Sequence, residues 1–344
     1  MDDREQVLLG FSGGVDSAAA AALLEQSGYQ VVPVVLDMGG AGRDFLLARA
    51  RKMANRLGLK LLVESVADIF TKNVVEYLLS SYSHALTPNP CIRCNALVKF
   101  AGLAALADRL QIEKIATGHY FRRNREGCFK ACDRLKDQSY FLFSVTPELM
   151  QRSLFPLGEI DKKTALSLAE KAGYELADYR ESQELCFLNG EKYQEFMRRQ
   201  GVGGGGGEIA DLEGIILGQH SGLQNYTIGQ RRGLGIAYPV PLYVVRLDYL
   251  NNRLLVGERD RACSAMCEVA EINWLAEVPE SGSEITCQIR YRHSPASAKL
   301  KIFSEDRVAV EFSAPQFAIT PGQGAAFFRG HQLLGGGFIC SAES

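Results

Sequence analysis

The sequence predicts an α/β fold, a doubly wound parallel sheet, followed by a small β-rich central domain and a C-terminal β-barrel. In the first half of the chain, apolar runs of strand length alternate with helical segments. After about residue 190 the pattern changes to short strand-like runs separated by turns. The glycine run Gly203–Gly207, which suits no regular element, follows this change and predicts a linker. We therefore expect domains at residues 1–200, 201–262 and 263–344.

The first domain opens with a strand, a glycine-rich turn and a helix. Gly28 and Gly58 follow the first two predicted helices, in the position that glycine favours at helix C-termini. The predicted elements are strands at Gln6–Phe11, Val31–Leu36, Leu61–Val63 and Lys114–Thr117, and helices at Ser17–Ser27, Phe45–Leu57, Ile69–Ser80 and Cys94–Leu110. This alternation is the reason to expect a parallel sheet covered by helices.

The second half begins with a short helix at Tyr193–Arg199 and then contains only strands and turns. Frequent turn residues separate the strands, as in small β domains and barrels. The clearest strand predictions are Tyr243–Leu247, Ile285–Arg292, Lys299–Phe303, Val308–Phe312 and Ala325–Phe328.

Composition limits the classes of function. The 344 residues are 47% hydrophobic and 23% charged, which is typical of a chain with two or three globular cores. The net charge of -2 gives no global signal for nucleic acid, so any such binding must be local. The N-terminus leaves no room for a signal peptide, and no apolar run approaches the roughly 20 residues of a membrane span. We expect a cytoplasmic protein with no membrane partner, whose nine cysteines are reduced.

A glycine-rich loop, Ser12–Ser17, lies between the first strand and the first helix. Backbone N–H groups at such a helix N-terminus can hold an anion, and Gly13 and Gly14 allow phosphate to approach closely. The loop has neither the Gly-Lys-Ser/Thr of a Walker loop nor the spacing of a dinucleotide loop. The structural alternative is a helix entry in which Asp16 or Ser17 merely caps the helix.

The cysteines divide into two groups. Cys91 and Cys94 form a C-x-x-C at the start of a predicted helix, where the positive end of the helix dipole favours a thiolate. Cys186 lies in a predicted loop, a common place for functional residues. The others have the character of small buried hydrophobes or hairpin positions: Cys128, Cys132, Cys263, Cys267, Cys287 and Cys340. Zinc at the C-x-x-C is less favoured, because an obvious second ligand pair is missing.

Motif blocks run from one end of the chain to the other. They are the loop Ser12–Ser17, Thr87-Pro88-Asn89-Pro90 with Cys94-Asn95, Ala116-Thr117-Gly118-His119-Tyr120, Lys136-Asp137-Gln138-Ser139-Tyr140-Phe141-Leu142, Cys186-Phe187, Tyr226-Thr227-Ile228-Gly229-Gln230-Arg231, Arg290-Tyr291-Arg292, Thr320-Pro321-Gly322-Gln323 and Leu334-Gly335-Gly336-Gly337. In this order they resemble the tRNA-specific 2-thiouridylase family of the PP-loop ATP-pyrophosphatase superfamily.

The resemblance implies an adenine nucleotide alpha hydrolase-like first domain and an ATP-dependent sulfurtransferase. Such an enzyme adenylates C2 of the wobble uridine of tRNA and replaces its oxygen with sulfur. The resemblance implies Mg²⁺ as a cofactor, with Asp16 serving the metal or the loop geometry. The ATP-binding residues that it implies are Gly10, Phe11, Ser12, Gly13, Gly14, Val15, Asp16, Ser17, Leu36 and Gly118.

By the same resemblance, the catalytic residues are Asp16, Cys94 and Cys186. Cys186 receives sulfur as a persulfide from a donor protein or small molecule, and Cys94 helps to release it and then closes a disulfide. The family usually has aspartate where this chain has Cys91. Three thiolates can hold a [4Fe–4S] cluster and leave one iron open, so we hypothesise a cluster on Cys91, Cys94 and Cys186, with the persulfide relay as the alternative.

The resemblance also implies the residues that contact tRNA, with Gln138 as the best candidate for the target nucleotide. A mixture of amide, charged and aromatic groups suits a flipped base and its phosphates. In the predicted strand Ile285–Arg292, alternation puts both arginines of the Arg290-Tyr291-Arg292 block on one face. The full set is Asn89, Pro90, Cys91, His119, Lys136, Asp137, Gln138, Arg231, Arg290, Tyr291, Arg292 and Gln323.

Two other functions remain open at this point. One is an ATP-dependent ligase or amidotransferase that acts on a small molecule, although no amino-donor motif is recognisable. The other is a non-catalytic tRNA-binding protein. The glycine-rich segment after Asp37 and the run Gly203–Gly207 depart from the family pattern, and the sequence offers no functional account of either.

Overall fold

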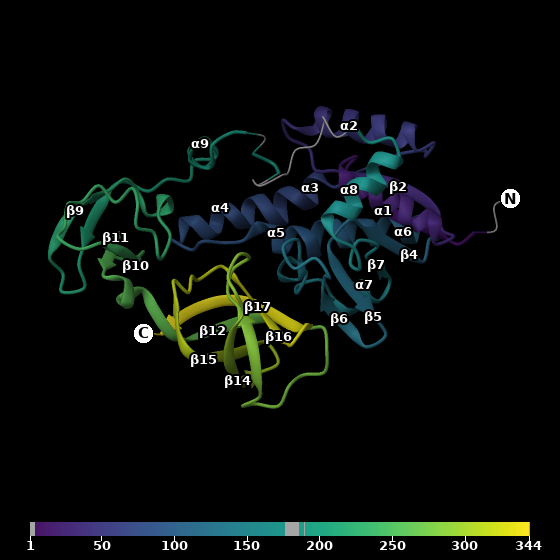
Figure 1. The fold of residues 1–344 in the computed structure, drawn as a ribbon. Coiled ribbons are helices and arrows are strands. Elements are labelled where there is room, and N and C mark those ends of the chain that lie inside the picture. The colour runs from purple at the N-terminus through teal and green to yellow at the C-terminus, as the bar shows by residue number, and fades with distance from the viewer. Residues whose placement is uncertain (1–3, 176–185, 189, 344) are drawn as a thin grey trace.

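The computed structural model describes residues 4–175, 186–188 and 190–343. The first domain, at the right of Figure 1, is built on a parallel sheet. The strand order of this sheet is β3-β2-β1-β4-β7. The strands are β1 (Gln6–Gly10), β2 (Gln30–Asp37), β3 (Leu62–Ser65), β4 (Lys114–Thr117) and β7 (Ser153–Leu154). β1 pairs in parallel with both β2 and β4, which confirms the predicted parallel sheet.

Helices cover both faces of this sheet. Val7 and Leu9 pack on one face with α1 and α2, whereas Leu8 packs on the other face with the helix that contains α6. All three side chains are fully buried, as in a doubly covered parallel sheet. The helices of this domain are α1 (Val15–Gln26), α2 (Arg43–Arg56), α3 (Ala67–Phe70), η1 (Thr71–Val75), α4 (Glu76–Ser83), α5 (Pro90–Arg93), η2 (Cys94–Phe100), α6 (Ala101–Leu110), η3 (Ser139–Phe141), α7 (Pro147–Gln151), α8 (Lys162–Lys171) and α9 (Tyr193–Arg199).

The helix that carries the C-x-x-C begins earlier than predicted, at Pro90, and continues to Leu110 through α5, η2 and α6. Asn89 caps it, because its side-chain oxygen accepts from the backbone N–H of Cys91 at 3.2 Å, and Pro90 suits the first helical position. Pro90–Leu110 also has the length and mean hydropathy of a membrane span, but 61% of its apolar window is buried inside the protein.

The central domain contains a four-stranded sheet with the order β10-β11-β8-β9. Its strands are β8 (Gly207–Ala210), β9 (Ile216–His220), β10 (Tyr243–Asp248) and β11 (Arg253–Gly257), with short 3₁₀ turns at Leu223–Asn225 (η5) and Arg259–Ala262 (η6). Gly207 is the first residue of β8, so the predicted linker is one residue too long. A small apolar core of its own holds this domain together.

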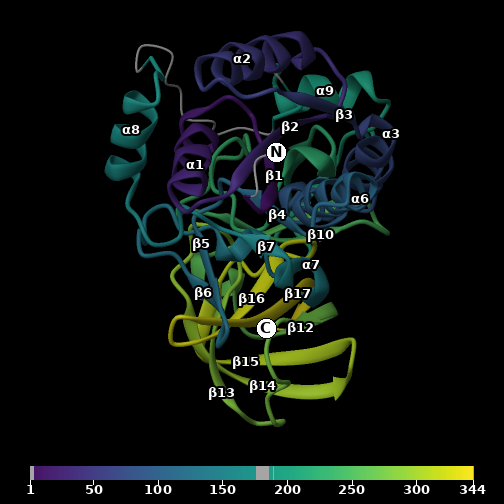
Figure 2. The ribbon, with the colours of Figure 1, turned by 90° about the vertical axis from the view of Figure 1, so that its right-hand side faces the viewer.

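The C-terminal domain is a closed antiparallel barrel, as predicted, with the strand order β12-β15-β14-β13-β16-β17 and a closing pair between β12 and β17. The strands are β12 (Cys263–Trp274), β13 (Glu284–Gln288), β14 (Ala296–Ser304), β15 (Arg307–Phe317), β16 (Gly324–Arg329) and β17 (Gln332–Glu343). The hairpin β5 (Phe121–Asn124) and β6 (Gly127–Lys130) of the first domain pairs with β17. The barrel lies directly below the first domain in Figure 2.

The prediction of a strand at Ile285–Arg292 is wrong at its C-terminal end. β13 ends at Gln288, whose side-chain amide donates to the carbonyls of Arg290 at 3.2 Å and Tyr291 at 2.6 Å. These bonds hold Arg290–His293 in a turn. The backbone N–H of His293 closes the turn by donating to the Arg290 carbonyl at 3.0 Å. The two arginines therefore do not alternate along a strand.

Candidate active site

The nucleotide loop Ser12–Ser17 connects β1 to α1, and its backbone requires glycine at one position. Gly13 has φ +70°, and a Cβ placed there would lie 2.6 Å from the Ala50 Cα and 2.7 Å from the Arg49 carbonyl oxygen. Both atoms belong to the backbone of α2, which cannot move without the whole helix. The loop is thus pressed against α2, and the Arg49 guanidinium, which sequence reasoning missed, donates to the Ser12 carbonyl at 3.1 Å.

The N-terminus of α1 is open to an anion. Gly14 occupies the N-cap position and supplies no side chain, so the first N–H groups of the helix keep their positive end exposed. The hydroxyl oxygens of Ser12 and Ser17 lie 3.4 Å apart above this helix end, and Ser17 donates to the Gly14 carbonyl at 2.9 Å. The first N–H groups of the helix and the exposed Ser12 hydroxyl are therefore available to an anion, whereas Ser17 is buried and its hydroxyl is bonded within the loop.

Gly118 and Asp16 fix the loop from the side of β4. A Cβ at Gly118 would lie 3.1 Å from the Asp16 carbonyl carbon, so the loop after β4 packs on the start of α1. The Asp16 carboxylate accepts from the Tyr120 hydroxyl at 2.8 Å and from the Lys162 ammonium at 2.6 Å. These contacts tie the start of α1 to the segment after β4 and to the N-terminus of α8.

The strand-end residues Gly10, Phe11 and Leu36, predicted to bind ATP, are largely buried. Gly10 and Phe11 belong to β1 and its continuation, where Phe11 donates its backbone N–H to the Val34 carbonyl at 2.7 Å. The Leu36 side chain joins the core beside Val66. Only an edge of Leu36 is therefore available to a ligand.

An ion pair that sequence reasoning missed organises the segment after β2. Asp37 is 6% exposed and accepts from the Arg43 guanidinium at 2.6 Å and from the Gly39 N–H at 3.0 Å. Burial opposes its charge, but the hydrogen bonds from Arg43 and Gly39 outweigh burial and hold the pKa of Asp37 below its usual value. The segment after Asp37 folds back so that Arg43 reaches the Asp37 carboxylate. Gly39 and Gly40 allow this turn, with φ +72° and +79°.

The structure brings the three predicted sulfur residues together. Cys91 is half-buried, Cys94 is 5% exposed and Cys186 is exposed, and each thiol lies within electrostatic range of the others. The Phe187 ring packs on Phe70, with 5.8 Å between the centroids, and on Phe196, at 5.3 Å, which holds the Cys186 backbone in place. In residues 4–175, 186–188 and 190–343, no group of three or more Cys, His, Asp or Glu side chains is already arranged to hold a metal ion.

Lys99 is the positive charge at the centre of this group, and sequence reasoning missed it. The π-helical segment η2 brings residues five positions apart into register, so Lys99 follows Cys94 on one face of the helix. Its ammonium donates to the Asn95 carboxamide oxygen at 3.0 Å, and Asn95 in turn donates to the Phe141 carbonyl at 3.1 Å. Burial opposes the charge of Lys99, whereas the attraction between its ammonium and the ionised forms of Cys94, Cys186 and Cys91 raises its pKa.

The prediction that the helix N-terminus stabilises the thiolates of Cys91 and Cys94 is wrong for the metal-free, reduced protein. Burial raises the pKa of both Cys91 and Cys94, and that of Cys94 reaches about 12, although the Lys99 charge opposes the change. Desolvation of the charged form therefore outweighs the helix terminus. Both thiols are protonated near neutral pH.

This protonation gives a testable pH dependence. Because only the thiolate reacts with iodoacetamide, we expect the alkylation rate of Cys94 in the reduced, metal-free protein to rise about tenfold per pH unit from pH 7 to 10 without a plateau. Peptide mass spectrometry measures this rate for Cys94 separately from the other cysteines. A plateau of the alkylation rate near pH 8 would contradict the raised pKa of Cys94.

His119 links the nucleotide loop to the cysteines. It directly follows Gly118, its ring stacks on Phe100 with 5.8 Å between the centroids, and its Nδ1 lies 2.9 Å from the Thr117 hydroxyl. Burial and the nearby Lys99 ammonium lower the pKa of His119 to about 3. His119 is thus a neutral imidazole at physiological pH, able to exchange hydrogen bonds but not to pair with phosphate as a cation.

The predicted tRNA block around Gln138 lies next to this site. The Gln138 side-chain oxygen accepts from the Tyr120 N–H at 2.9 Å, which leaves its NH₂ group without a partner among the residues described. Asp137 accepts from Ala131 and Ser139 and holds this turn in shape. Lys136 is half-buried at the start of the same turn.

The Thr320–Gln323 block braces the start of the cysteine helix. The Gln323 amide donates to the Thr87 carbonyl at 2.8 Å, and Thr87 donates its N–H to the Pro321 carbonyl at 3.1 Å. Thr87 also lies against the central domain, with its hydroxyl 3.4 Å from that of Thr227. All three domains therefore meet at the loop that leads into Asn89, Pro90 and Cys91.

The predicted arginines are distributed over two domains. Arg290 is half-buried and donates to the carbonyls of Phe317 and Ala318, whereas Arg292 is exposed. Tyr291 packs on Phe141, with 4.4 Å between the ring centroids. Arg231 is exposed on the central domain, which lies at the opposite end of the molecule from α1 (Figure 1).

Comparison with known proteins decides the family. Three profiles cover the chain in order: a tRNA methyl transferase HUP domain at residues 5–190, a tRNA methyl transferase PRC-barrel domain at 194–258, and an aminomethyltransferase beta-barrel domain at 264–339. A tRNA-specific 2-thiouridylase MnmA from a Synechocystis species is 41% identical over 99% of this chain and 98% of its own length. The proteins of the same name from a Synechococcus species and from Carboxydothermus hydrogenoformans are 42% and 39% identical, each over 98% of this chain and over 94% and 98% of their own lengths.

The chain belongs to the tRNA-specific 2-thiouridylase family. This confirms the family resemblance of the motif blocks and the α/β fold followed by a small domain and a barrel. Membership of this family also supports the use of ATP by this chain.

Proposed function

We propose that this protein is an ATP-dependent tRNA-uridine 2-sulfurtransferase, acting on the wobble uridine. One observation carries the proposal. Gly118 packs on the nucleotide loop, and the next residue, His119, lies beside Lys99 and its three cysteines. The proposed phosphate-binding loop and the three cysteines proposed for sulfur transfer are thus connected through two consecutive residues, Gly118 and His119. We further propose the cytoplasm as the place of action, since tRNA, ATP and reduced thiols occur there together.

In the activation step, O2 of the uridine attacks the α-phosphorus of ATP and pyrophosphate leaves. The nucleotide loop and the N-terminus of α1 stabilise the charge on the phosphates. The product is an adenylated uridine. Its O2, which is a poor leaving group by itself, can now leave as part of AMP, which is a good one. Mg²⁺ would enter with the ATP phosphates, because the Asp16 carboxylate already pairs with Lys162.

In the relay route, sulfur transfer uses Cys186 and Cys94. The terminal sulfur of a Cys186 persulfide attacks C2, and AMP leaves with the former uridine oxygen. Cys94 then loses its proton and attacks the inner sulfur of Cys186, and the 2-thiouridine that leaves takes up a proton at N3. A disulfide remains between the two cysteines. A persulfide donor and a thiol reductant complete the cycle.

The cluster route uses the same cysteines. Three soft thiolates fit a [4Fe–4S] cluster, and Cys91, Cys94 and Cys186 would hold it, with Lys99 balancing their negative charge. When bound, the cluster would supply an open iron site for inorganic sulfide. Iron and sulfide analysis after anaerobic purification and reconstitution separates the routes, since intact thiolation without iron would exclude the cluster.

The proposed function is tested by incubating the protein with unmodified tRNA, ATP, Mg²⁺ and a sulfide or persulfide source, followed by mass spectrometry of the nucleosides. We expect AMP and 2-thiouridine in equal amounts. AMP with unaltered tRNA and an amidated or ligated metabolite would instead identify a PP-loop ligase. Tight tRNA binding without either product would identify a non-catalytic tRNA-binding protein.

A further inference from the structure

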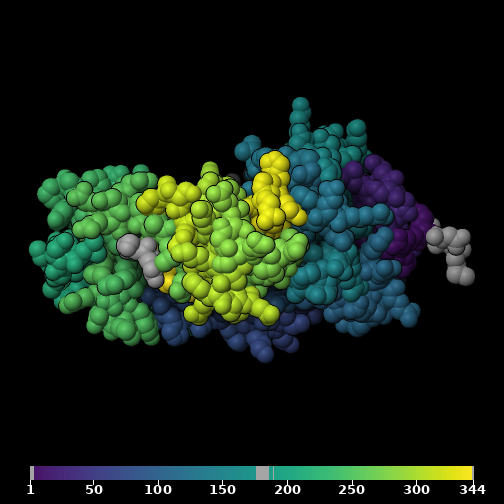
Figure 3. All heavy atoms as spheres, turned by 90° about the horizontal axis from the view of Figure 1, so that it is seen from below, coloured from purple at the N-terminus to yellow at the C-terminus, as the bar shows by residue number. Residues whose placement is uncertain are grey.

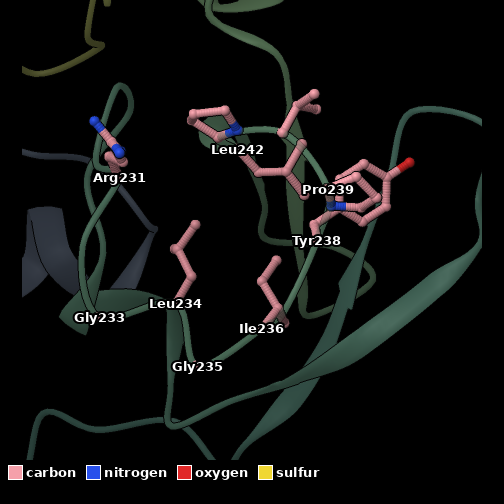
Figure 4. A pocket seen from close by; sticks show the side chains of 10 residues that line it. Arg231, Gly233, Leu234, Gly235, Ile236, Tyr238, Pro239 and Leu242 are labelled. Carbon is pink, nitrogen blue, oxygen red and sulfur yellow. The ribbon is translucent and has the colours of Figure 1, made fainter.

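The central domain carries a recess of about 380 Å³ that lies far from the nucleotide loop. It is formed by the loop between Gln230 and β10, and Figure 4 shows Arg231 on one side and Tyr238 on the other. The Leu234 and Ile236 side chains extend into the space between them. In the space-filling view of Figure 3, the central domain forms one end of an elongated molecule, beyond the barrel.

The base of this loop is held rigidly. Gln230 accepts from the Thr227 N–H at 3.2 Å and donates from its side chain to the Arg232 carbonyl at 2.9 Å. Its backbone carbonyl accepts from the Val244 N–H at 2.9 Å. On the far rim, Pro239 and Pro241 restrict φ, which lowers the conformational entropy that this rim loses when a ligand binds.

The walls combine three kinds of group that nucleotides require. Leu234 and Leu242 form a buried apolar floor, and the Tyr238 side chain is 47% exposed, so its ring is free to stack. From Gly235 to Leu242, no backbone N–H donates to another group of the described protein, which leaves donors for the edge of a base. Arg231 lines the recess, and Arg232 follows it in the chain without lining it. Both are exposed, and neither has a carboxylate partner in the described part of the chain, so both can pair with phosphate.

We propose that this recess binds one unpaired nucleotide of the tRNA substrate, other than the uridine that reacts. The base stacks on Tyr238 above the apolar floor, and Arg231 and Arg232 hold the flanking phosphates. The volume lies within the range of about 300–1,000 Å³ typical of small-ligand pockets, which is enough for one base and its sugar. The proposal rests on tRNA being the substrate, and it assigns the recess an anchoring role remote from the chemistry.

Tyr238→Ala tests the stacking, and Tyr249→Ala is the matched control. Tyr249 is 50% exposed on the same domain, in the turn after β10, and does not line the recess. Because a stacked base contributes about 1–3 kcal/mol, we expect Tyr238→Ala to raise the Kd for unmodified tRNA about 5- to 150-fold. At saturating tRNA the rate of AMP formation stays at the wild-type value, since only binding is impaired. Equal Kd values for the wild type and Tyr238→Ala would overturn the proposal.

Chemical probing of the bases identifies the occupant and remains informative if a variant loses stability. We expect wild-type protein to protect an unpaired base besides the reacting uridine, and Tyr238→Ala to lose that protection while keeping the others. AMP added without RNA should bind the wild type and Tyr238→Ala with the same affinity, whereas weaker AMP binding to Tyr238→Ala would identify a free-nucleotide site instead. If the wild type binds and protects tRNA in this way but forms no thiouridine, the proposed function fails and the recess assignment stands.

Discussion

We expect serine in place of Cys94 or Cys186 to lower 2-thiouridine formation by about a thousandfold or more, the size of effect found when a nucleophile is removed. No hydrogen bond of the nucleotide loop in the described structure involves either cysteine, so tRNA-dependent consumption of ATP should continue in both variants. A hydroxyl can neither carry a persulfide nor act as a soft metal ligand. Nucleoside mass spectrometry and an AMP assay on the same samples measure the two steps.

Two other cysteines provide matched controls. Cys128 is buried as Cys94 is, and Cys132 is exposed as Cys186 is, yet both lie on the β5–β6 hairpin side of the domain. Serine at either position should leave thiolation within about threefold of the wild-type rate, as for a substitution away from the reacting groups. Thiolation that survives at Cys94→Ser and Cys186→Ser would contradict both sulfur routes.

Gly13→Ala should reduce ATP cleavage by more than about a hundredfold, because misplacing a phosphate-binding loop by about 1 Å has an effect of that size. The added Cβ would collide with the backbone of α2 and must displace the loop or the helix. The rate of AMP formation and the thermal unfolding midpoint give the effects on activity and stability separately.

Gly28→Ala is the control for backbone strain. Gly28 has φ +87°, similar to Gly13, but a Cβ there meets nothing within 4 Å. It should lose about 1 kcal/mol of stability from the unfavourable φ and retain full ATP cleavage. If Gly13→Ala behaves like Gly28→Ala, the close packing of α2 on the loop is not important for nucleotide binding.

Local patterns in the sequence predicted the first domain well. The apolar run before Ser12 and the glycines after it define a strand, a turn and a helix without reference to the rest of the chain, and the structure has these elements at β1 and α1. The strand predicted at Ile285–Arg292 was too long, because side-chain bonds from Gln288 to the following carbonyls end it early. Hydrophobic periodicity carries no information about such a bond.

The parts of the site that sequence reasoning missed depend on contacts across the fold. Lys99 faces Cys94 only because the helix is π-helical there, and an ordinary helix turns the two side chains apart. Cys186 lies near the C-x-x-C because the neighbouring Phe187 packs on Phe70, and no local sequence motif predicts this contact. Gln323 was predicted as a tRNA contact, and that prediction stays open. The bond from its amide to the Thr87 carbonyl is a further contact that the sequence did not predict.

The central claim is that the oxygen of the uridine leaves as part of AMP. We would prepare tRNA with oxygen-18 at O2 of the reacting uridine and run one turnover with ATP, Mg²⁺ and the sulfur source. The mechanism predicts one oxygen-18 atom in AMP for each 2-thiouridine formed, because the bond from O2 to phosphorus persists while the bond from C2 to oxygen breaks. Unlabelled AMP together with label retained in the RNA or released to water would contradict it.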